Sequence, residues 1–161
     1  MSALPYVVII LIVVLIRSFF VTPILVNGAS MYPTLENNQM LLLNKFKKNY
    51  NRFDIVVIDI ENERFIKRVI GLPNEKVRYA EGVLYIDDKK VDDPKASITE
   101  DFDMYSINHL IIPEGMYFVL GDNRTNSIDS RIFGLVSSKD IQGTATIRLF
   151  PFKNFGKIDK N

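Results

Sequence analysis

The N-terminal end of the chain carries a dense run of apolar residues. From Leu4 to Ile16 the sequence is LPYVVIILIVVLI, and after two further positions it continues as FFVTPILV to Val26. This pattern predicts a helix over Leu4–Thr22, with Pro23 as its natural stop. At about 1.5 Å per residue such a helix is roughly 28 Å long, which matches the hydrocarbon core of a bilayer. We therefore interpret residues 1–24 as an uncleaved transmembrane anchor.

Two other interpretations of this apolar segment stay open. A cleaved signal peptide normally begins with basic residues, which are absent from Met1-Ser2-Ala3, and ends at small residues, which Asn27 and Ala29 match poorly. A buried core helix is the second alternative. Because no Lys or Arg precedes the segment, the positive-inside rule gives no orientation.

Beyond Val26, apolar and polar residues alternate with the period of two that is typical of half-buried strands. Seven strands rich in Val, Ile, Tyr and Phe are expected, at Gln39–Asn44, Asp54–Ile60, Arg64–Ile70, Lys76–Tyr79, Val83–Ile86, Met116–Leu120 and Ile141–Leu149. Hairpin turns are expected at Glu81-Gly82 and Asp87-Asp88. The polar segment from Asp92 to Asn108 is interpreted as a surface excursion. Residues 25–161 should form one mostly antiparallel β domain without a long amphipathic helix.

The composition narrows the chemistry that this chain can perform. Its 161 residues include 20 basic and 19 acidic side chains, so the formal net charge is +1, without the positive excess that favours nucleic-acid binding. The absence of cysteine excludes disulfides, thiolate nucleophiles and cysteine metal sites. His109 is the single histidine, which excludes a His-rich zinc site. Any Ser-His-Asp triad would have to use this imidazole.

A short polar segment, GASMYPTL, directly follows the apolar region. Its Gly, Ser and Pro residues are ordinary turn formers, so a plain turn is one interpretation. Its position supports another. Ser30 lies seven residues after Pro23, so even an extended chain at about 3.3 Å per residue keeps it within roughly 23 Å of the expected helix end. A nucleophile at Ser30 would therefore act close to the lipid surface.

The expected strand RFIKRVI, residues 64–70, carries two adjacent cations among apolar neighbours. Alternation puts Lys67 and Arg68 on opposite faces, so one of them shares an apolar face. In an edge strand both charged ends would reach water along their apolar stems. In a desolvated position, the pKa of Lys67 would instead fall from about 10.4 toward about 7–8. The neutral amine would then be able to accept a proton from a serine hydroxyl.

A dense polar segment, GDNRTNSIDSR, follows the apolar strand segment MYFVL. Asp, Asn and Ser are frequent in turns, so a plain connector is one interpretation. The segment holds two carboxylates, two arginines and two serines within eleven residues. Such groups can fix one another in a hydrogen-bonded network, which a mere connector does not need.

Together these segments resemble the bacterial type I signal peptidases, membrane-anchored serine proteases that use a Ser-Lys dyad. The resemblance rests on five blocks that follow one another along nearly the whole chain. They are the apolar anchor, GASMYPTL, RFDIVVI, RFIKRVIGLP, and GDNRTNSIDSR with IFG behind it. Each block alone is weak or moderate evidence for the resemblance, whereas five blocks in the same order are highly specific evidence.

The resemblance implies a role for each matching polar residue. Ser30 would be the nucleophile, Lys67 the general base, and Ser127 the hydroxyl that orients the lysine amine. Supporting positions that hold an ion pair or fix the loop would be Asp122, Asp129 and Arg131. The backbone N–H of Ser30 would stabilise the oxyanion. Some family members add a hydroxyl two positions earlier, where this chain has Gly28, a supporting position without a side-chain donor.

The resemblance also implies a β-rich serine protease domain on the outer face of the bacterial cytoplasmic membrane, held by a single helix. Its activity would be the removal of signal peptides from exported preproteins, after small residues of the Ala-x-Ala type. The substrate would pair as an extended peptide with the strand edges that lead into Ser30 and Lys67. Preproteins and membrane lipids would be the partners of a monomeric enzyme, with no nucleic acid, metal or cofactor.

Three other functions stay open from the residues. A Ser-Lys enzyme with a different substrate would resemble the self-cleaving LexA-like repressors, or would process one pilin-like protein. The repressor version needs a helix-turn-helix, where this chain has hydrocarbon-like residues. A membrane-anchored β binding module without turnover is another alternative. It requires that Ser30 and Lys67 are not in hydrogen-bond contact. A triad through His109 has no local companion that orients the imidazole.

Overall fold

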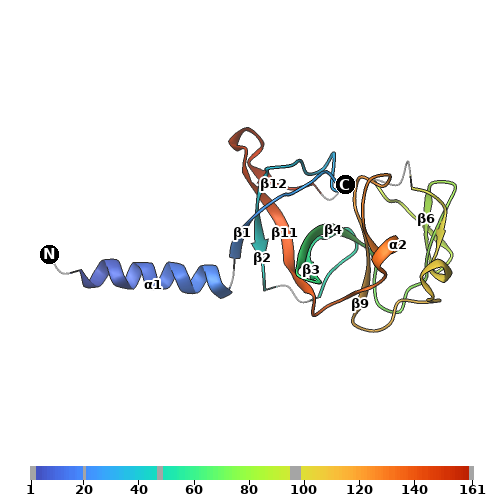
Figure 1. Ribbon diagram of the computed structural model, residues 1–161, viewed down its shortest axis with the longest axis horizontal. Helices are drawn as coiled ribbons and strands as arrows, with labels where there is room; N and C mark the ends of the chain where they lie inside the picture. Colours follow the sequence, from blue (N-terminus) through green and yellow to red (C-terminus); the bar gives the residue numbers. More distant parts are fainter. Residues whose placement is uncertain (1–2, 20, 47–48, 95–98, 160–161) are drawn as a thin grey trace.

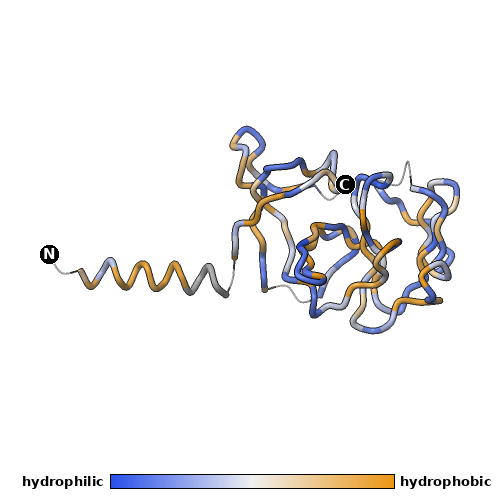
Figure 2. Tube along the Cα trace, in the orientation of Figure 1, coloured by the Kyte–Doolittle hydropathy of each residue, from blue (hydrophilic) through white to orange (hydrophobic). Residues whose placement is uncertain are grey.

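The computed structural model describes residues 3–19, 21–46, 49–94 and 99–159. Figure 1 shows one helix, α1 (Leu4–Phe19), leading away from a body built of strands. Figure 2 shows mostly apolar residues along the first part of α1, whereas apolar and polar positions intermingle along the strands. The distribution of apolar residues thus differs between the helix and the β body.

The body contains two sheets, and every strand pairing described is antiparallel. The larger sheet consists of β1 (Val21–Leu25), β2 (Met40–Asn44), β3 (Ile55–Ile60), β4 (Glu63–Gly71), β9 (Met116–Leu120), β10 (Val136–Ser137), β11 (Ile141–Phe150) and β12 (Gly156–Lys157). The smaller sheet consists of β5 (Val77–Ala80), β6 (Val83–Ile86), β7 (Lys89–Val91) and β8 (Phe102–Asp103). Short helical turns are η2 (Met104–Ile107), α2 (Ser130–Phe133) and η3 (Phe152–Asn154). The expected mostly antiparallel β fold is confirmed.

Strand order places β4 in the interior of the larger sheet. The order is β1-β2-β11-β3-β4-β9-β10, with β12 paired to β11, and the smaller sheet has the order β7-β6-β5-β8. β4 pairs with β3 along Glu63–Arg68, whereas its pairing with β9 begins at Arg68. The first half of β4 therefore has a sheet neighbour on one side and an open edge on the other.

All seven expected strands are present, with ends that differ by at most one residue. Both expected turns have the left-handed backbone of two-residue hairpins, with φ of 51° and 71° at Glu81 and Gly82, and 50° and 62° at Asp87 and Asp88. Five strands lie outside the expected set: β1, β7, β8, β10 and β12. Each has two to five residues, too few for a period of two to stand out.

The predicted helix over Leu4–Thr22 is wrong at its C-terminal end. α1 ends at Phe19, and Phe20 lies outside the described residues. Val21–Leu25 forms the strand β1, which pairs with β2. Pro23 lies inside this strand instead of stopping a helix. It is tolerated there because β1 is an edge strand, where a missing N–H interrupts no ladder on the open side.

α1 has 16 residues, and from Leu4 to Val14 every side chain is exposed. Within the part of the chain that the structure describes, no helix combines the length and the apolar character needed to cross a membrane.

The segment 92–108 is only partly the surface excursion that its polar composition predicts. Residues 95–98 lie outside the described residues. After them, β8 pairs with β5, and Met104 is fully buried in a cluster that both sheets share. Asp93 is buried as well, because its carboxylate is bonded to Tyr79 and Arg124, which lie elsewhere in the chain.

Phe118 of β9 lies where the two sheets meet. Its side chain is fully buried and stacks on Phe102 of β8, with ring centroids 5.0 Å apart. The surrounding cluster includes Ile70 of the larger sheet and Val77 of the smaller sheet. This shared core holds the smaller sheet against the strand that leads into the dense polar loop.

We expect Phe118→Ala to lower the free energy of unfolding by about 3–5 kcal/mol, because it leaves a cavity in the shared core. Phe152, which is 81% exposed, provides the matched control. Phe152→Ala removes the same atoms from a solvent-facing position and should cost less than about 1 kcal/mol. Urea unfolding followed by circular dichroism measures both changes. Equal losses in the two variants would contradict the shared core.

Candidate active site

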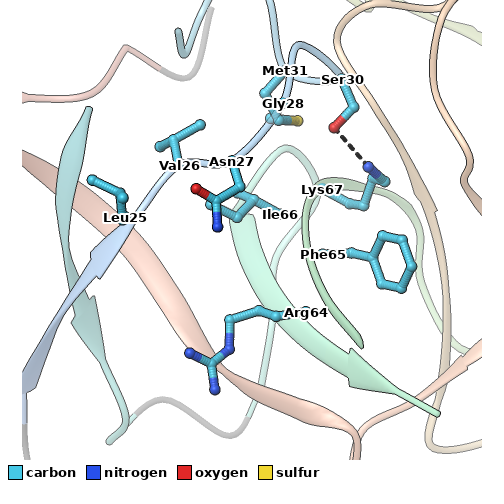
Figure 3. A pocket seen from close by; sticks show the side chains of 10 residues that line it. All are labelled: Leu25, Val26, Asn27, Gly28, Ser30, Met31, Arg64, Phe65, Ile66 and Lys67. Carbon is cyan, nitrogen blue, oxygen red and sulfur yellow. Dashed lines mark hydrogen bonds between the residues drawn. The ribbon is translucent and has the colours of Figure 1, made fainter. Parts of the chain in front are cut away.

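The segment that follows β1 and the first half of β4 face each other across a cavity of about 230 Å³ (Figure 3). Its lining comes from residues 25–31 and 64–67, namely Leu25, Val26, Asn27, Gly28, Ser30, Met31, Arg64, Phe65, Ile66 and Lys67. Figure 3 shows Ser30 and Lys67 side by side at one end of the cavity. Two segments far apart in the sequence therefore bring together the two residues that the resemblance singles out.

The hydroxyl of Ser30 and the amine of Lys67 are hydrogen-bonded. The distance from Lys67 Nζ to Ser30 Oγ is 2.8 Å (Figure 3). Ser30 is half-buried, and Lys67 is 2% exposed. This is a distance over which a proton can pass between a hydroxyl and an amine.

Burial sets the protonation of Lys67. Lys67 belongs to β4, an interior strand of the larger sheet. Its Nζ is 5.5 Å from the centroid of the Phe65 ring. Desolvation lowers the pKa of Lys67 from 10.5 to about 8, against the opposing effect of Asp129 and Asp122. The alternative of an edge strand with both cations in water is wrong, because Lys67 and Arg68 are both buried.

Buried apolar residues fix the turn that carries Ser30. Met31 and Leu35 belong to the core of the larger sheet, and the Leu35 N–H donates to the Met31 carbonyl at 2.8 Å. On the other side, the Ser30 carbonyl accepts a hydrogen bond from the Asn123 N–H at 3.0 Å. Ser30 is thus held from both sides.

Gly28 gives this turn its backbone conformation. Its φ is +88°, a region that favours glycine, and a Cβ there would meet no atom within 4 Å. Its N–H donates to Asn37 Oδ1 at 2.9 Å. The position at which some family members carry a hydroxyl therefore serves the shape of the turn, and its amide is committed to a bond within the protein.

Asp129 holds the dense polar loop after β9. Its Oδ2 accepts from the Gly121 N–H at 3.0 Å, and its Oδ1 caps α2 by accepting from the Arg131 N–H at 3.3 Å. The Arg131 guanidinium donates to both oxygens of the carboxylate at 2.9 Å. Asp129 is fully buried. The segment is therefore a bonded network and not a plain connector.

Gly121 is the point at which this loop lies against Ser30. A Cβ at this position would collide with the Ser30 carbonyl and with Ser127 Oγ, so a larger residue requires movement of the backbone. Ser127 Oγ is buried and has no hydrogen-bond partner among the described residues. It is not bonded to Lys67, and its role in orienting the amine stays a prediction.

The buried cation next to Lys67 has a carboxylate of its own. Arg68 donates from Nε and Nη2 to the two oxygens of Asp122, each at 2.7 Å, and both side chains are fully buried. The sequence points to Asp122 as a supporting residue but not to Arg68 as its partner. The alternation shows that one of the two cations, Lys67 or Arg68, shares an apolar face, but it identifies neither which one nor its partner.

A second buried arginine, Arg124, connects the loop to the smaller sheet. Its Nη1 donates to Asp93 Oδ2 at 2.8 Å and to Thr99 Oγ1 at 2.7 Å. The same nitrogen is 3.1 Å from the hydroxyl oxygen of Tyr79, and burial raises the pKa of that hydroxyl. Arg124 Nε donates to the Gly121 carbonyl at 2.9 Å. Sequence reasoning missed this cluster, because its members come from segments that show no common motif.

His109 lies away from Ser30 and Lys67. It lines a separate cavity of about 210 Å³, and neither Ser30 nor Lys67 borders that cavity. The alternative of a triad through His109 is therefore wrong for this serine. In the described ranges, no group of three or more His, Asp or Glu side chains is placed to hold a metal ion.

The model of one protein family, described as "Signal peptidase, peptidase S26", matches residues 2–150. The chain belongs to this family. Signal peptidase I S of Bacillus subtilis (strain 168) is 39% identical to it over 157 residues, which cover 90% of this chain and 85% of that protein. Signal peptidase I T of the same strain is 41% identical over 162 residues, with 89% and 81% covered. Signal peptidase I of Bacillus caldolyticus is 38% identical over 166 residues, with 94% and 91% covered.

A solved structure agrees with the family assignment. The crystal structure of a signal peptidase I from Enterococcus faecalis V583 matches with a TM-score of 0.56 at 37% identity, covering 60% of this chain and 96% of that chain. As a member of the signal peptidase family, the chain is a serine peptidase and therefore a hydrolase. The expectation of an enzyme is confirmed, and the alternative of a binding module without turnover is wrong.

We expect Asp122→Ala to lower the free energy of unfolding by about 3–5 kcal/mol, because it removes the carboxylate that compensates a buried guanidinium. Asp59→Ala is the control, since it breaks the exposed pair that Asp59 forms with Arg64 at 3.0 Å. That change should cost less than about 1 kcal/mol. Chemical unfolding of both variants gives the comparison, and a small loss for Asp122→Ala would show that the buried pair contributes little.

Proposed function

We propose that this chain removes N-terminal signal peptides from exported preproteins with a Ser30–Lys67 catalytic dyad, and that it cleaves after small residues of the Ala-x-Ala type. The contact of 2.8 Å between Ser30 Oγ and the buried Lys67 Nζ carries the proposal. Membership of the signal peptidase family supports it, as does the similarity to proteins named signal peptidase I.

Lys67 acts as the general base in its neutral form. With a pKa of about 8, roughly a tenth of the amine is uncharged at pH 7. The amine lone pair accepts the hydroxyl proton of Ser30 while the oxygen attacks the carbonyl carbon of the scissile bond. The ammonium then gives this proton to the leaving nitrogen as the C–N bond breaks, which leaves an acyl-enzyme. Lys67 next takes a proton from a water molecule, whose oxygen attacks the carbonyl carbon of the ester. The ammonium returns this proton to Ser30 Oγ as the ester C–O bond breaks, which releases the signal peptide and restores the enzyme.

The backbone N–H of Ser30 is the proposed donor to the oxyanion. A well-aimed donor of this kind contributes about 3 kcal/mol to transition-state stabilisation. The bond from Asn123 to the Ser30 carbonyl keeps the neighbouring peptide group in place. We assign Ser127 to the orientation of the Lys67 amine. Its buried Oγ has no hydrogen-bond partner among the described residues and lies beside Gly121.

The open edge of β4 is the proposed binding site for an extended substrate. The two-residue turn after Ile60 makes Ile60 and Glu63 a hydrogen-bonded pair of the hairpin. Since such pairs alternate along antiparallel strands, Arg64 and Ile66 direct their N–H and C=O groups away from β3. A substrate strand in the cavity can bond to these groups, while small side chains enter the apolar part lined by Val26 and Met31.

We further propose that residues 1–24 anchor the enzyme and that residues 25–161 form a monomeric catalytic domain on the outer face of the bacterial cytoplasmic membrane. The exposed apolar side chains of α1 support this assignment, because a helix that is apolar all round is unfavourable in water. β1 starts at Val21, two positions after the last residue of α1, and ends at Leu25 in the wall of the cavity. This connection keeps the active site near the lipid.

A row of exposed apolar side chains on the larger sheet suits contact with membrane lipids. Met40 is the cross-strand partner of both Leu25 and Phe150, and all three side chains are exposed. Phe150 contacts the more exposed Phe152 edge-to-face, with ring centroids 5.6 Å apart. The row begins at the wall of the cavity, so a lipid surface that covers it would lie beside the bound substrate.

Ser30→Ala and Lys67→Ala should each lower kcat/KM for a preprotein with an Ala-x-Ala site by about 10⁴-fold or more. The reason is that the two side chains act as one catalytic unit, so the loss of either one costs about as much as the loss of both. Lys139→Ala, at an exposed position outside the cavity, should leave the rate unchanged. Gel-based cleavage of several preproteins measures both effects. Circular dichroism confirms that the variants fold. Processing by a folded Lys67→Ala enzyme would rule out the dyad, and cleavage of one preprotein alone would favour a dedicated processing enzyme.

The rate should rise with pH through the pKa of Lys67. Because burial lowers this pKa to about 8, kcat/KM is expected to increase about tenfold per pH unit below pH 8 and to level off above it. The measurement is cleavage of one preprotein from pH 6 to pH 10 in buffers of constant ionic strength. A profile that keeps rising to pH 10 would mean that the amine titrates as it does in water.

A further inference from the structure

A second cavity, of about 290 Å³, adjoins the dyad. Ser30, Lys67 and Phe65 line both cavities, whereas Ile66 lines the first cavity alone. The residues that only the second cavity has are Ala29, Asn126 and Ile128. Figure 3 shows the side chains of Phe65 and Ile66 on opposite sides of β4. The second cavity therefore opens toward the Phe65 side of the strand.

Alternation in the substrate assigns side chains to these two sides. Successive side chains of an extended peptide point in opposite directions. The proposed substrate directs the small residues at −1 and −3 toward the first cavity, on the Ile66 side. The residue at +1, the first after the scissile bond, and the residue at −2 are both direct neighbours of −1. Their side chains therefore point to the side opposite to that of −1. Both of these side chains face the Phe65 side.

The position of the loop after β9 distinguishes +1 from −2. The open edge of β4 ends at Lys67, because β9 pairs with the strand from Arg68 onward. Residues before the scissile bond therefore lie along Glu63–Lys67, and the chain after it runs toward the loop. Ile128 belongs to this loop, so it lies at the end of the second cavity that receives +1.

We propose that Ile128 and Phe65 form an apolar subsite for the side chain of the first residue of the released protein, and that this subsite favours an aliphatic residue over alanine at +1. The proposal rests on the proposed signal peptide cleavage. Ile128 is 58% exposed, so it is not part of the core. Its position is nevertheless fixed, because it lies between the buried Ser127 hydroxyl and Asp129, whose carboxylate holds the loop.

The test compares two exposed isoleucines close together in the chain. Ile132 is 70% exposed, lies on α2 and borders neither cavity, so Ile132→Ala is the matched control for Ile128→Ala. Full-length enzyme in detergent is given preproteins that share one Ala-x-Ala site and carry Ala, Val or Leu at +1. A second series varies −2, and a third varies −1. The measured quantity is the ratio of kcat/KM within each series.

The wild-type enzyme should cleave the Leu substrate faster than the Ala substrate at +1. Ile128→Ala should reduce this ratio by about fourfold for each substrate methylene that the shortened side chain leaves in water. The ratios at −1 and −2 should stay unchanged, and Ile132→Ala should behave like the wild type. An unchanged +1 ratio in Ile128→Ala, or an equal change at −2, would overturn the subsite while leaving the peptidase intact. Absence of cleavage by the wild type would instead overturn the proposed function, and the subsite with it.

Discussion

In the proposed mechanism, the amine of Lys67 has to be dry enough to give up its proton and still reach Ser30, and the candidate active site is organised around this constraint. An exposed lysine would keep its proton at neutral pH, whereas burial lowers the pKa of Lys67 to about 8. Lys67 is buried because it lies on β4, an interior strand of the larger sheet. It is still accessible to a substrate because it lines the first cavity. The half-buried Ser30 bridges the two environments, because its hydroxyl contacts the amine from the side that a substrate can enter.

Two buried carboxylates oppose this arrangement, since Asp122 and Asp129 favour the ammonium form of Lys67. Each of them is bonded to a guanidinium, Asp122 to Arg68 and Asp129 to Arg131. A carboxylate paired in this way exerts a weaker net field on a neighbouring amine, so desolvation remains the largest effect. The two ion pairs therefore hold the loop and also limit the electrostatic penalty for a neutral lysine.

The smaller sheet contributes to the candidate site without contacting Ser30 or Lys67. Phe118 joins its core to that of the larger sheet, and Arg124 ties Asp93 near the smaller sheet to the carbonyl of Gly121. Gly121 in turn lies against Ser30, where a side chain would collide. The stability of the two-sheet interface and the geometry of the turn that carries Ser30 are therefore linked through one loop.

Local sequence patterns were sufficient to predict the β architecture and the two hairpin turns. The family resemblance singled out Ser30 and Lys67, which lie in hydrogen-bond contact in the structure. Alternation and turn preferences act between near neighbours, so they can be recognised in a single strand, and five motif blocks in order identified the family. Long-range contacts were needed to show that Val21–Leu25 is a strand and not the end of a helix, because pairing with β2 competes with the helical tendency of the apolar run. They were also needed to show that Arg68 bonds to Asp122, 54 positions away, and that Arg124 bonds to Asp93. Such partners depend on which strands pair and in which register, and no local pattern of residues records that choice.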